Sequence, residues 1–178
     1  MSTATFPLEG TFAADPIHSS FGFAVKHMGV NTFRGTLGDV SATLNDGVLE
    51  GAAKVESISI TTPEEFRAHV LSPEFFDAAA HPEVTFRSTA LDLREDGTAT
   101  VSGELTIKGI TREVTGAGTW QAPVPAPWGD AVVGSLELSA QIDRRDFGMT
   151  WNAPLPKGGN ILAEQVTLNI HVELQGQA

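Results

Sequence analysis

The sequence predicts an all-β domain, folded as a sandwich or a closed barrel of roughly seven to nine antiparallel strands with one short helical insertion. Most of the chain alternates apolar and polar residues with a period of two, as strands with one buried face do. Turn signals such as Asn45-Asp46-Gly47 and Glu95-Asp96-Gly97 separate the alternating runs. Only residues 63–80 carry helix signals instead.

The alternating runs begin near residue 20, where Phe21, Phe23 and Val25 share one face. The later runs repeat this pattern with Val84 and Phe86; with Val101, Leu105 and Ile107; with Val132, Leu136, Leu138, Ala140 and Ile142; and with Val166, Leu168, Ile170, Val172 and Leu174. Long strands that are polar on one face must bury the other, and one short helix cannot cover so much sheet. Closure removes edge strands, so a barrel is favoured over a sandwich, and a barrel of about eight strands can hold one small ligand.

The helical insertion starts at Thr62-Pro63, which we interpret as an N-cap followed by the first helical residue. Phe66 and Val70 lie four residues apart and therefore share one face. Ser72-Pro73 repeats the start signal, which predicts a second short helix that carries Phe75 and Phe76 and ends near His81-Pro82.

The 178 residues suffice for one domain, residues 1–178, with a sizeable core. The formal charge of −11 repels phosphate, so neither nucleic acid nor an anionic membrane surface is an expected partner. The absence of cysteine excludes disulfides, thiolate metal sites and a cysteine nucleophile. Because the sequence shows no signal-peptide pattern and no apolar stretch of about 18 residues, we expect a cytoplasmic protein without stable membrane insertion.

Asp15, His18 and Ser19 invite comparison with a catalytic triad. Neighbouring residues of a strand point to opposite faces, so the Ser19 hydroxyl would face away from the His18 ring, and we expect no nucleophilic catalysis. In the structural alternative, Asp15 turns the chain, and His18 and Ser19 form hydrogen bonds at the start of a strand. The histidine spacing predicts no metal site, since His18 and His27 would lie about 30 Å apart along one strand, although a site assembled across strands stays open.

Two other polar positions have two interpretations each. His27 shares the face of Phe21 and is either a half-buried residue bonded to a carbonyl or a polar contact for a ligand. The run Arg144-Arg145-Asp146 follows a clean strand and is either an ion-paired strand end or a polar rim for a ligand head group.

Large apolar side chains also occur outside the strands. Phe66, Phe75 and Phe76 belong to the helical insertion, and Met149 and Trp151 belong to a Gly- and Pro-rich connection over residues 148–164. Long connections in compact domains are often lids or binding loops. These side chains therefore either plug the barrel ends or form the mouth of an apolar cavity.

Three blocks of the chain, taken together, carry a family resemblance. The first is Asp15-Pro-Ile-His18-Ser19-Ser-Phe21-Gly-Phe23-Ala-Val25-Lys-His27-Met-Gly, continuing to Phe33-Arg34-Gly35. The second runs from Thr62 through Ser72-Pro-Glu-Phe75-Phe76-Asp77, then His81-Pro82-Glu83-Val84-Thr-Phe86. The third is Gly103-Glu-Leu105-Thr-Ile107-Lys108-Gly109-Ile-Thr111, followed by Arg145-Asp146-Phe147-Gly148. In this order and spacing they resemble the YceI-like family of lipid-binding proteins over nearly the whole chain.

The resemblance implies an extended eight-stranded antiparallel β-barrel, similar to a lipocalin, whose apolar cavity holds a polyisoprenoid or related long-chain lipid. Because many members of the family are dimers, the resemblance also implies a homodimer for this chain. It implies no catalytic residue, metal or cofactor. We therefore predict non-enzymatic binding, storage or transport of a long-chain isoprenoid-type lipid. The predicted ligand contacts are Phe21, Phe23, Val25, His27, Phe66, Phe75, Phe76, Phe86, Leu105, Leu136, Met149 and Trp151. The alternatives are an enzyme that acts on a hydrophobic substrate through His27, Arg145 and Asp146, and a plugged barrel that serves as an interaction module.

Overall fold

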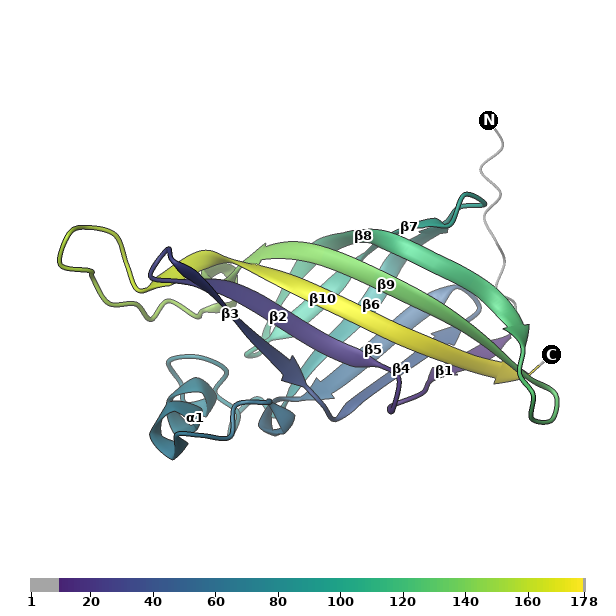
Figure 1. The fold of residues 1–178 in the computed structure, drawn as a ribbon, viewed down its shortest axis with the longest axis horizontal. Helices are drawn as coiled ribbons and strands as arrows, with labels where there is room; N and C mark the ends of the chain where they lie inside the picture. The colour runs from purple at the N-terminus through teal and green to yellow at the C-terminus, as the bar shows by residue number, and fades with distance from the viewer. Residues whose placement is uncertain (1–9, 178) are drawn as a thin grey trace.

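Ten antiparallel strands form one continuous sheet in the computed structural model, which describes residues 10–177 (Figure 1). Eight of them, in the order β1-β4-β5-β6-β7-β8-β9-β10, close into a barrel because β10 pairs with both β9 and β1. Strands β2 and β3 form a hairpin that extends the sheet from β10. The predicted all-β barrel of eight strands with one short helix is confirmed.

The strands are β1 (Thr11–Ala14), β2 (Ser20–His27), β3 (Asn31–Leu37), β4 (Val40–Asn45), β5 (Val48–Lys54), β6 (Glu83–Leu93), β7 (Thr98–Ile107), β8 (Ile110–Pro125), β9 (Ala131–Asp143) and β10 (Leu162–Gln177). The helical elements are η1 (Val55–Ser57), α1 (Glu64–Leu71) and η2 (Arg144–Phe147). No helix among residues 10–177 is long and apolar enough to cross a membrane.

The sheet has ten strands rather than the seven to nine that the spacing predicts, and β1 and β2 pair with different stretches of β10. β1 pairs with the C-terminal part of β10, where Ala14 lies opposite Leu174, and its other edge pairs with β4. β2 pairs with the middle of β10, where Phe21 lies opposite Ile170, and its other edge pairs with β3. The barrel is thus closed by β1 and β4 in one half, and by the β2–β3 hairpin in the other.

The helical insertion differs from its prediction in two details. Helix α1 has Pro63 rather than Thr62 as its N-cap residue, so the predicted start is one residue too early. The second helix does not form. The amides of Phe75 and Asp77 both donate to the Ser72 carbonyl, three and five residues back, and successive turns therefore replace an α-helical ladder.

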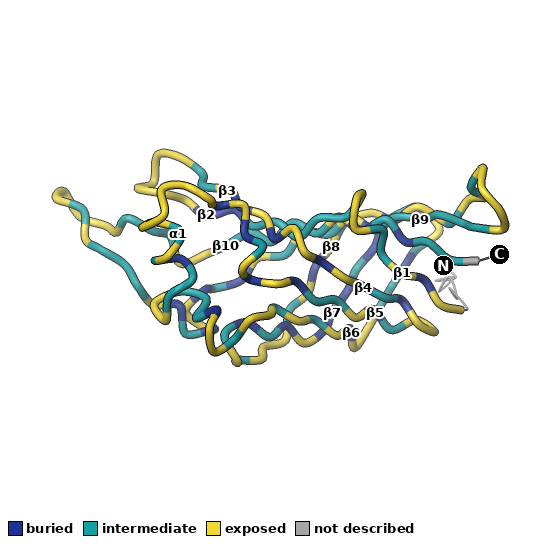
Figure 2. Tube along the Cα trace, turned by 90° about the horizontal axis from the view of Figure 1, so that it is seen from below, coloured by how far each residue is buried: buried dark blue, intermediate teal, exposed yellow. Residues whose placement is uncertain are grey.

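The two ends of the barrel are built differently. Both described chain ends lie at one end, and α1 lies with the β2–β3 turn at the other (Figures 1 and 2). At the end near the termini, large side chains such as Phe12, Leu44 and Trp120 fill the barrel as a buried cluster. We call this the filled end and the opposite one the mouth.

Candidate ligand-binding cavity

A cavity of about 710 Å³ lies inside the barrel, between the filled end and the mouth. Side chains from strands β2 to β10, from α1 and from the connection between η2 and β10 line it. The wall is predominantly aliphatic and aromatic. A plugged barrel is therefore the wrong interpretation of this sequence.

Small residues at inward positions create the empty space. Ala42, Gly51, Gly116 and Ala140 all line the cavity, each on a different strand. A Cβ placed on Gly116 would meet its nearest neighbours at ordinary van der Waals distances of 3.4–3.7 Å, so the position has room for a side chain that glycine does not supply. The void follows from the sequence, because these inward positions carry almost no side chain to fill it.

The structure gathers eleven of the twelve predicted contact residues in the cavity wall. They are Phe21, Phe23, Val25, His27, Phe66, Phe75, Phe76, Phe86, Leu105, Met149 and Trp151. The exception is Leu136, which is 3% exposed and packs in the buried cluster of the filled end, among Phe12 and Trp120. Strand parity placed Leu136 on the inward face correctly, but parity carries no information about depth along the barrel.

Phe33 belongs to the wall although the sequence analysis did not propose it. It lies opposite Val25 in the β2–β3 hairpin and so shares the inward face. Continuing the period-two pattern past the Met28-Gly29 turn would have found it. With Phe33 included, seven of the ten phenylalanines of the chain line the cavity.

Aromatic rings form the side of the mouth between the hairpin and α1. The Phe23 ring lies 6.1 Å from that of Phe33 and 6.4 Å from that of Phe76, measured between centroids. The Phe33 ring meets Phe66 of α1 edge to face at 5.9 Å. Backbone hydrogen bonds join the end of β3 to residues 57–59, and beyond them these ring contacts close the gap between the hairpin and α1.

A second aromatic group joins the helical insertion to the connection after η2. The Trp151 ring contacts His69 edge to face at 4.8 Å and Phe75 at 5.5 Å. Nε2 of His69 lies 2.5 Å from a carboxylate oxygen of Glu74, which orients the imidazole. Trp151 therefore lies across the mouth as part of a lid anchored on both sides.

The buried guanidinium of Arg144 holds the lid connection in place. Arg144 is 4% exposed and donates to the carbonyls of Met149 at 2.6 Å, Trp151 at 2.9 Å and Ala163 at 2.8 Å. Burial lowers the pKa of this guanidinium, and the negative charges of Glu164 and Asp143 oppose that effect. Arg144 is therefore not an ion-paired strand end, one of the two interpretations of this run, and it contributes to the cavity wall.

Arg145 takes the ion-paired role that the sequence analysis offered for this run. Its guanidinium bonds Asp143 at 2.6 Å and Glu164 at 3.0 Å. The hydrogen bond from the Arg145 side chain, followed by that from its backbone amide, lowers the pKa of Asp143 to about 2. Arg145 and Asp146 are exposed and lie outside the cavity wall, whereas His27 is in it. The three polar residues considered for an enzyme are therefore not assembled around one cavity.

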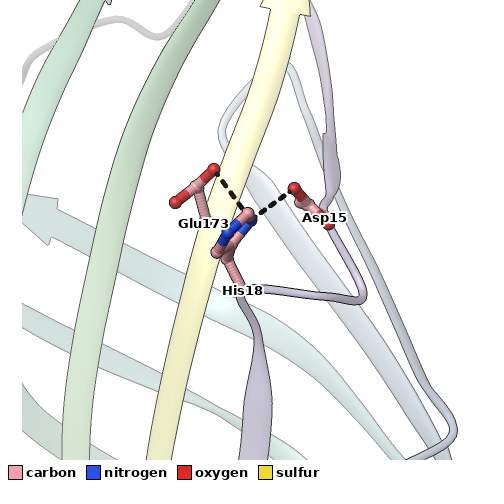
Figure 3. A group of neighbouring side chains, drawn as sticks. All are labelled: Asp15, His18 and Glu173. Carbon is pink, nitrogen blue, oxygen red and sulfur yellow. Dashed lines mark hydrogen bonds and ion pairs between the residues drawn. The ribbon is translucent and has the colours of Figure 1, made fainter.

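A separate polar cluster joins the start of β2 to β10, away from the cavity (Figure 3). Nδ1 of His18 lies 2.7 Å from a carboxylate oxygen of Asp15 and 3.6 Å from one of Glu173. Ser19 Oγ accepts from the Glu173 amide at 3.1 Å, so the structural alternative to a triad is confirmed. The hydrogen bond raises the pKa of His18 and lowers that of Asp15. The three side chains could each offer one ligand atom to a metal, but their mutual hydrogen bond and ion pair already account for the grouping.

Comparison with known proteins gives a consistent answer. Residues 12–174 match the YceI-like domain family. A UPF0312 protein of Staphylococcus aureus (strain N315) is 29% identical over 168 residues, which cover 91% of this chain and 95% of that protein. A UPF0312 protein of Pseudomonas putida (strain W619) is 28% identical over 163 residues, or 88% and 80% of the two chains.

Solved structures share the fold at low identity. The YceI protein of Campylobacter jejuni superposes with a TM-score of 0.70 at 21% identity, covering 86% of this chain and 90% of that one. BcnA of Burkholderia cenocepacia gives 0.65 at 21% identity, with 92% and 99% covered. A polyisoprenoid-binding domain from Saccharophagus degradans gives 0.63 at 12% identity, with 93% and 98% covered. At these identities the likeness establishes the fold alone.

Proposed function

The chain belongs to the YceI-like domain family, and from that premise we propose that its barrel binds and carries a long-chain isoprenoid-type lipid without transforming it. The observation that carries the proposal is the cavity of about 710 Å³ whose wall includes seven phenylalanines. A wall of this kind offers an apolar ligand a place out of water and few groups that would bind a polar one. The related domain from Saccharophagus degradans, described as polyisoprenoid-binding, supports the same ligand class.

The size of the cavity supports a long chain. At about 30 Å³ for a group the size of a water molecule, 710 Å³ accommodates about 20 methylene-sized groups. Burial of each methylene contributes about 0.8 kcal/mol, so 20 of them contribute about 16 kcal/mol before the costs of association, which are about 4–15 kcal/mol. Because the gain is spread along the chain, tight binding needs no strong contact to a head group.

Mass spectrometry of the protein as purified, after extraction with organic solvent, tests the proposal directly. We expect a co-purifying lipid with a long apolar chain. The delipidated protein should then bind geranylgeraniol, a C20 isoprenoid alcohol, more tightly than decanol by at least about tenfold, because the shorter chain buries fewer methylenes. Equal affinity for the two alcohols, or no binding of either, would refute the proposal.

A pair of matched variants separates the cavity from the outer surface. Ala140→Phe adds a phenyl ring inside the cavity, whereas Ala117→Phe adds the same ring at an exposed position of the neighbouring strand. We expect Ala140→Phe to weaken geranylgeraniol binding at least about tenfold and Ala117→Phe to leave it unchanged. Thermal unfolding of both variants controls for misfolding.

A homodimer and a cytoplasmic location stay predictions of the sequence analysis. Sedimentation equilibrium measures the first, and fractionation of the producing cells measures the second.

A further inference from the structure

Most lysines and arginines of this chain have an oxygen partner, and the few without one lie together at one end of the barrel. Eight of the eleven donate to a carboxylate or a carbonyl oxygen, as Lys54 does to Asp39 and Lys108 to the carbonyls of Pro73 and Gly148. Across residues 10–177, Lys26, Arg34 and Lys157 have no such partner, and all three are exposed. Two of them lie on the β2–β3 hairpin and the third in the connection before β10, which both belong to the mouth end.

The acidic residues avoid the same region. None of the 22 Asp and Glu residues falls within residues 19–38 or 147–163. The backbone amide of Met28 donates to the Ile161 carbonyl at 2.6 Å, so the two segments are joined where they meet. In both views they lie at the same end of the barrel (Figures 1 and 2). We call residues 26–34 and 153–161 the mouth surface.

The mouth surface also presents apolar side chains to solvent. Val30 is 81% exposed and Met28 is 46% exposed at the tip of the hairpin, where Met28 and Gly29 adopt positive φ angles in a tight turn. Pro154 and Pro156 are exposed in the other segment. Apolar tips between unpaired cations are the composition of surfaces that enter the head-group region of a bilayer.

The opposite end of the barrel offers a contrast. It exposes Val124 and Trp128, but Asp130 follows them closely, and among residues 10–177 no unpaired lysine or arginine lies on that end. Next to the mouth surface, α1 carries the exposed Glu64 and Glu65 in its first turn. The two loop tips, rather than α1, are therefore suited to face a negative surface.

We propose that the mouth surface docks reversibly on an anionic lipid bilayer, which brings the cavity mouth to the head-group region. The net charge of −11 opposes binding of the molecule as a whole. Charge acts over about 10 Å in 0.1 M salt, however, so a bilayer that meets the mouth surface is exposed mainly to its three cations. Docking is thus weak, oriented and sensitive to salt. Vesicle binding can occur whether or not the cavity holds lipid, so this proposal and the proposed function fail independently.

Flotation with vesicles tests the docking. We expect the protein to float with vesicles of phosphatidylglycerol and phosphatidylcholine at low ionic strength, and to remain in solution with pure phosphatidylcholine or in 0.5 M salt. A Lys26→Gln, Lys157→Gln double variant should lower the partition coefficient about 25-fold, at about fivefold for each lysine removed. Arg94→Gln removes an ion-paired cation near the filled end and should change it less than twofold.

A second pair of variants tests the exposed apolar tip of the hairpin. Val30→Asp and Ile17→Asp both add one negative charge at positions that are 81% and 84% exposed, but only Val30 belongs to the mouth surface. We expect Val30→Asp to reduce vesicle binding at least tenfold and Ile17→Asp to reduce it less than twofold. Unfolding curves that match the unsubstituted protein confirm that both variants fold. Equal losses in the two variants, no binding to the anionic vesicles, or a mouth surface that mediates self-association without vesicle binding would each overturn the docking proposal.

Discussion

Replacement of Arg144 by methionine tests whether the lid is held by a single buried cation. Methionine keeps much of the apolar stem but removes the donors to the carbonyls of Met149, Trp151 and Ala163. A buried polar group left without its partner costs about 1–3 kcal/mol, and a bond to a charged donor is worth more than a neutral one. Since part of the connection can relax toward water, we expect a loss of about 3–5 kcal/mol in the free energy of unfolding.

Arg145→Met is the matched control, because the two arginines are adjacent and differ mainly in burial. The Arg145 side chain is 50% exposed, and its ion pairs with Asp143 and Glu164 are open to solvent. Exposed ion pairs typically contribute less than about 1 kcal/mol, so this variant should lose no more than that.

Equilibrium unfolding in urea, followed by far-ultraviolet circular dichroism, measures both variants on the same scale. Hydrogen exchange provides a second readout, since amides of residues 149–161 should exchange faster in Arg144→Met than in Arg145→Met. A loss for Arg144→Met that lies within about 1 kcal/mol of the loss for Arg145→Met would refute the anchoring role.

Three further predictions concern packing, pH and ligand exchange. Gly118→Ala should lower the free energy of unfolding by about 3 kcal/mol, because the added Cβ would lie 1.9 Å from the Glu137 carbonyl oxygen. The control Gly116→Ala should lower it by less than about 1 kcal/mol, and equal losses in the two variants would contradict the described packing. Because the pKa of Asp143 is lowered to about 2, its contribution to stability is present above the ordinary value of 3.8 and is lost as pH falls toward 2. The unfolding temperature, measured from pH 6 to 2, should therefore fall less steeply with pH in Asp143→Asn than in the unsubstituted protein. Parallel curves for the two proteins would exclude this contribution. Trp151→Ala removes two aromatic contacts and should speed the release of bound geranylgeraniol about tenfold in stopped-flow displacement; an unchanged rate would exclude Trp151 from the lid.

The faces of the strands could be predicted from the sequence because side-chain direction alternates strictly along a strand. That rule alone placed Phe21, Phe23 and Val25 inward. It could not show that Leu136 is packed while Leu138 on the same face borders the cavity, since depth depends on what other strands place opposite each residue. At Leu136 the neighbours are Trp120 and Val172, which fill the space.

The polar positions were harder to predict for a different reason. Two adjacent arginines look equivalent in a sequence, yet η2 turns Arg144 inward under the lid and leaves Arg145 outside with Asp143. The alternation rule ends where the strand ends, so a 3₁₀ turn can assign the two side chains to different environments. The start of α1 was also misplaced by one residue, because Pro63 is its N-cap residue and no side chain caps the helix with a hydrogen bond.

The division of the barrel into a filled half and a hollow half follows from the cost of empty space. Atoms that line a void lose the contacts a packed neighbour would give, so a cavity of this size weakens the half that contains it. The fold compensates at the other half, where Phe12 and Trp120 pack in the barrel and β1 joins β4 to β10. Between the β2–β3 hairpin and α1, closure of the hollow half relies instead on aromatic contacts such as Phe33 with Phe66. Side-chain contacts between loops and a helix can separate locally at lower cost than a strand ladder, so the weaker half is also the half through which a ligand can enter.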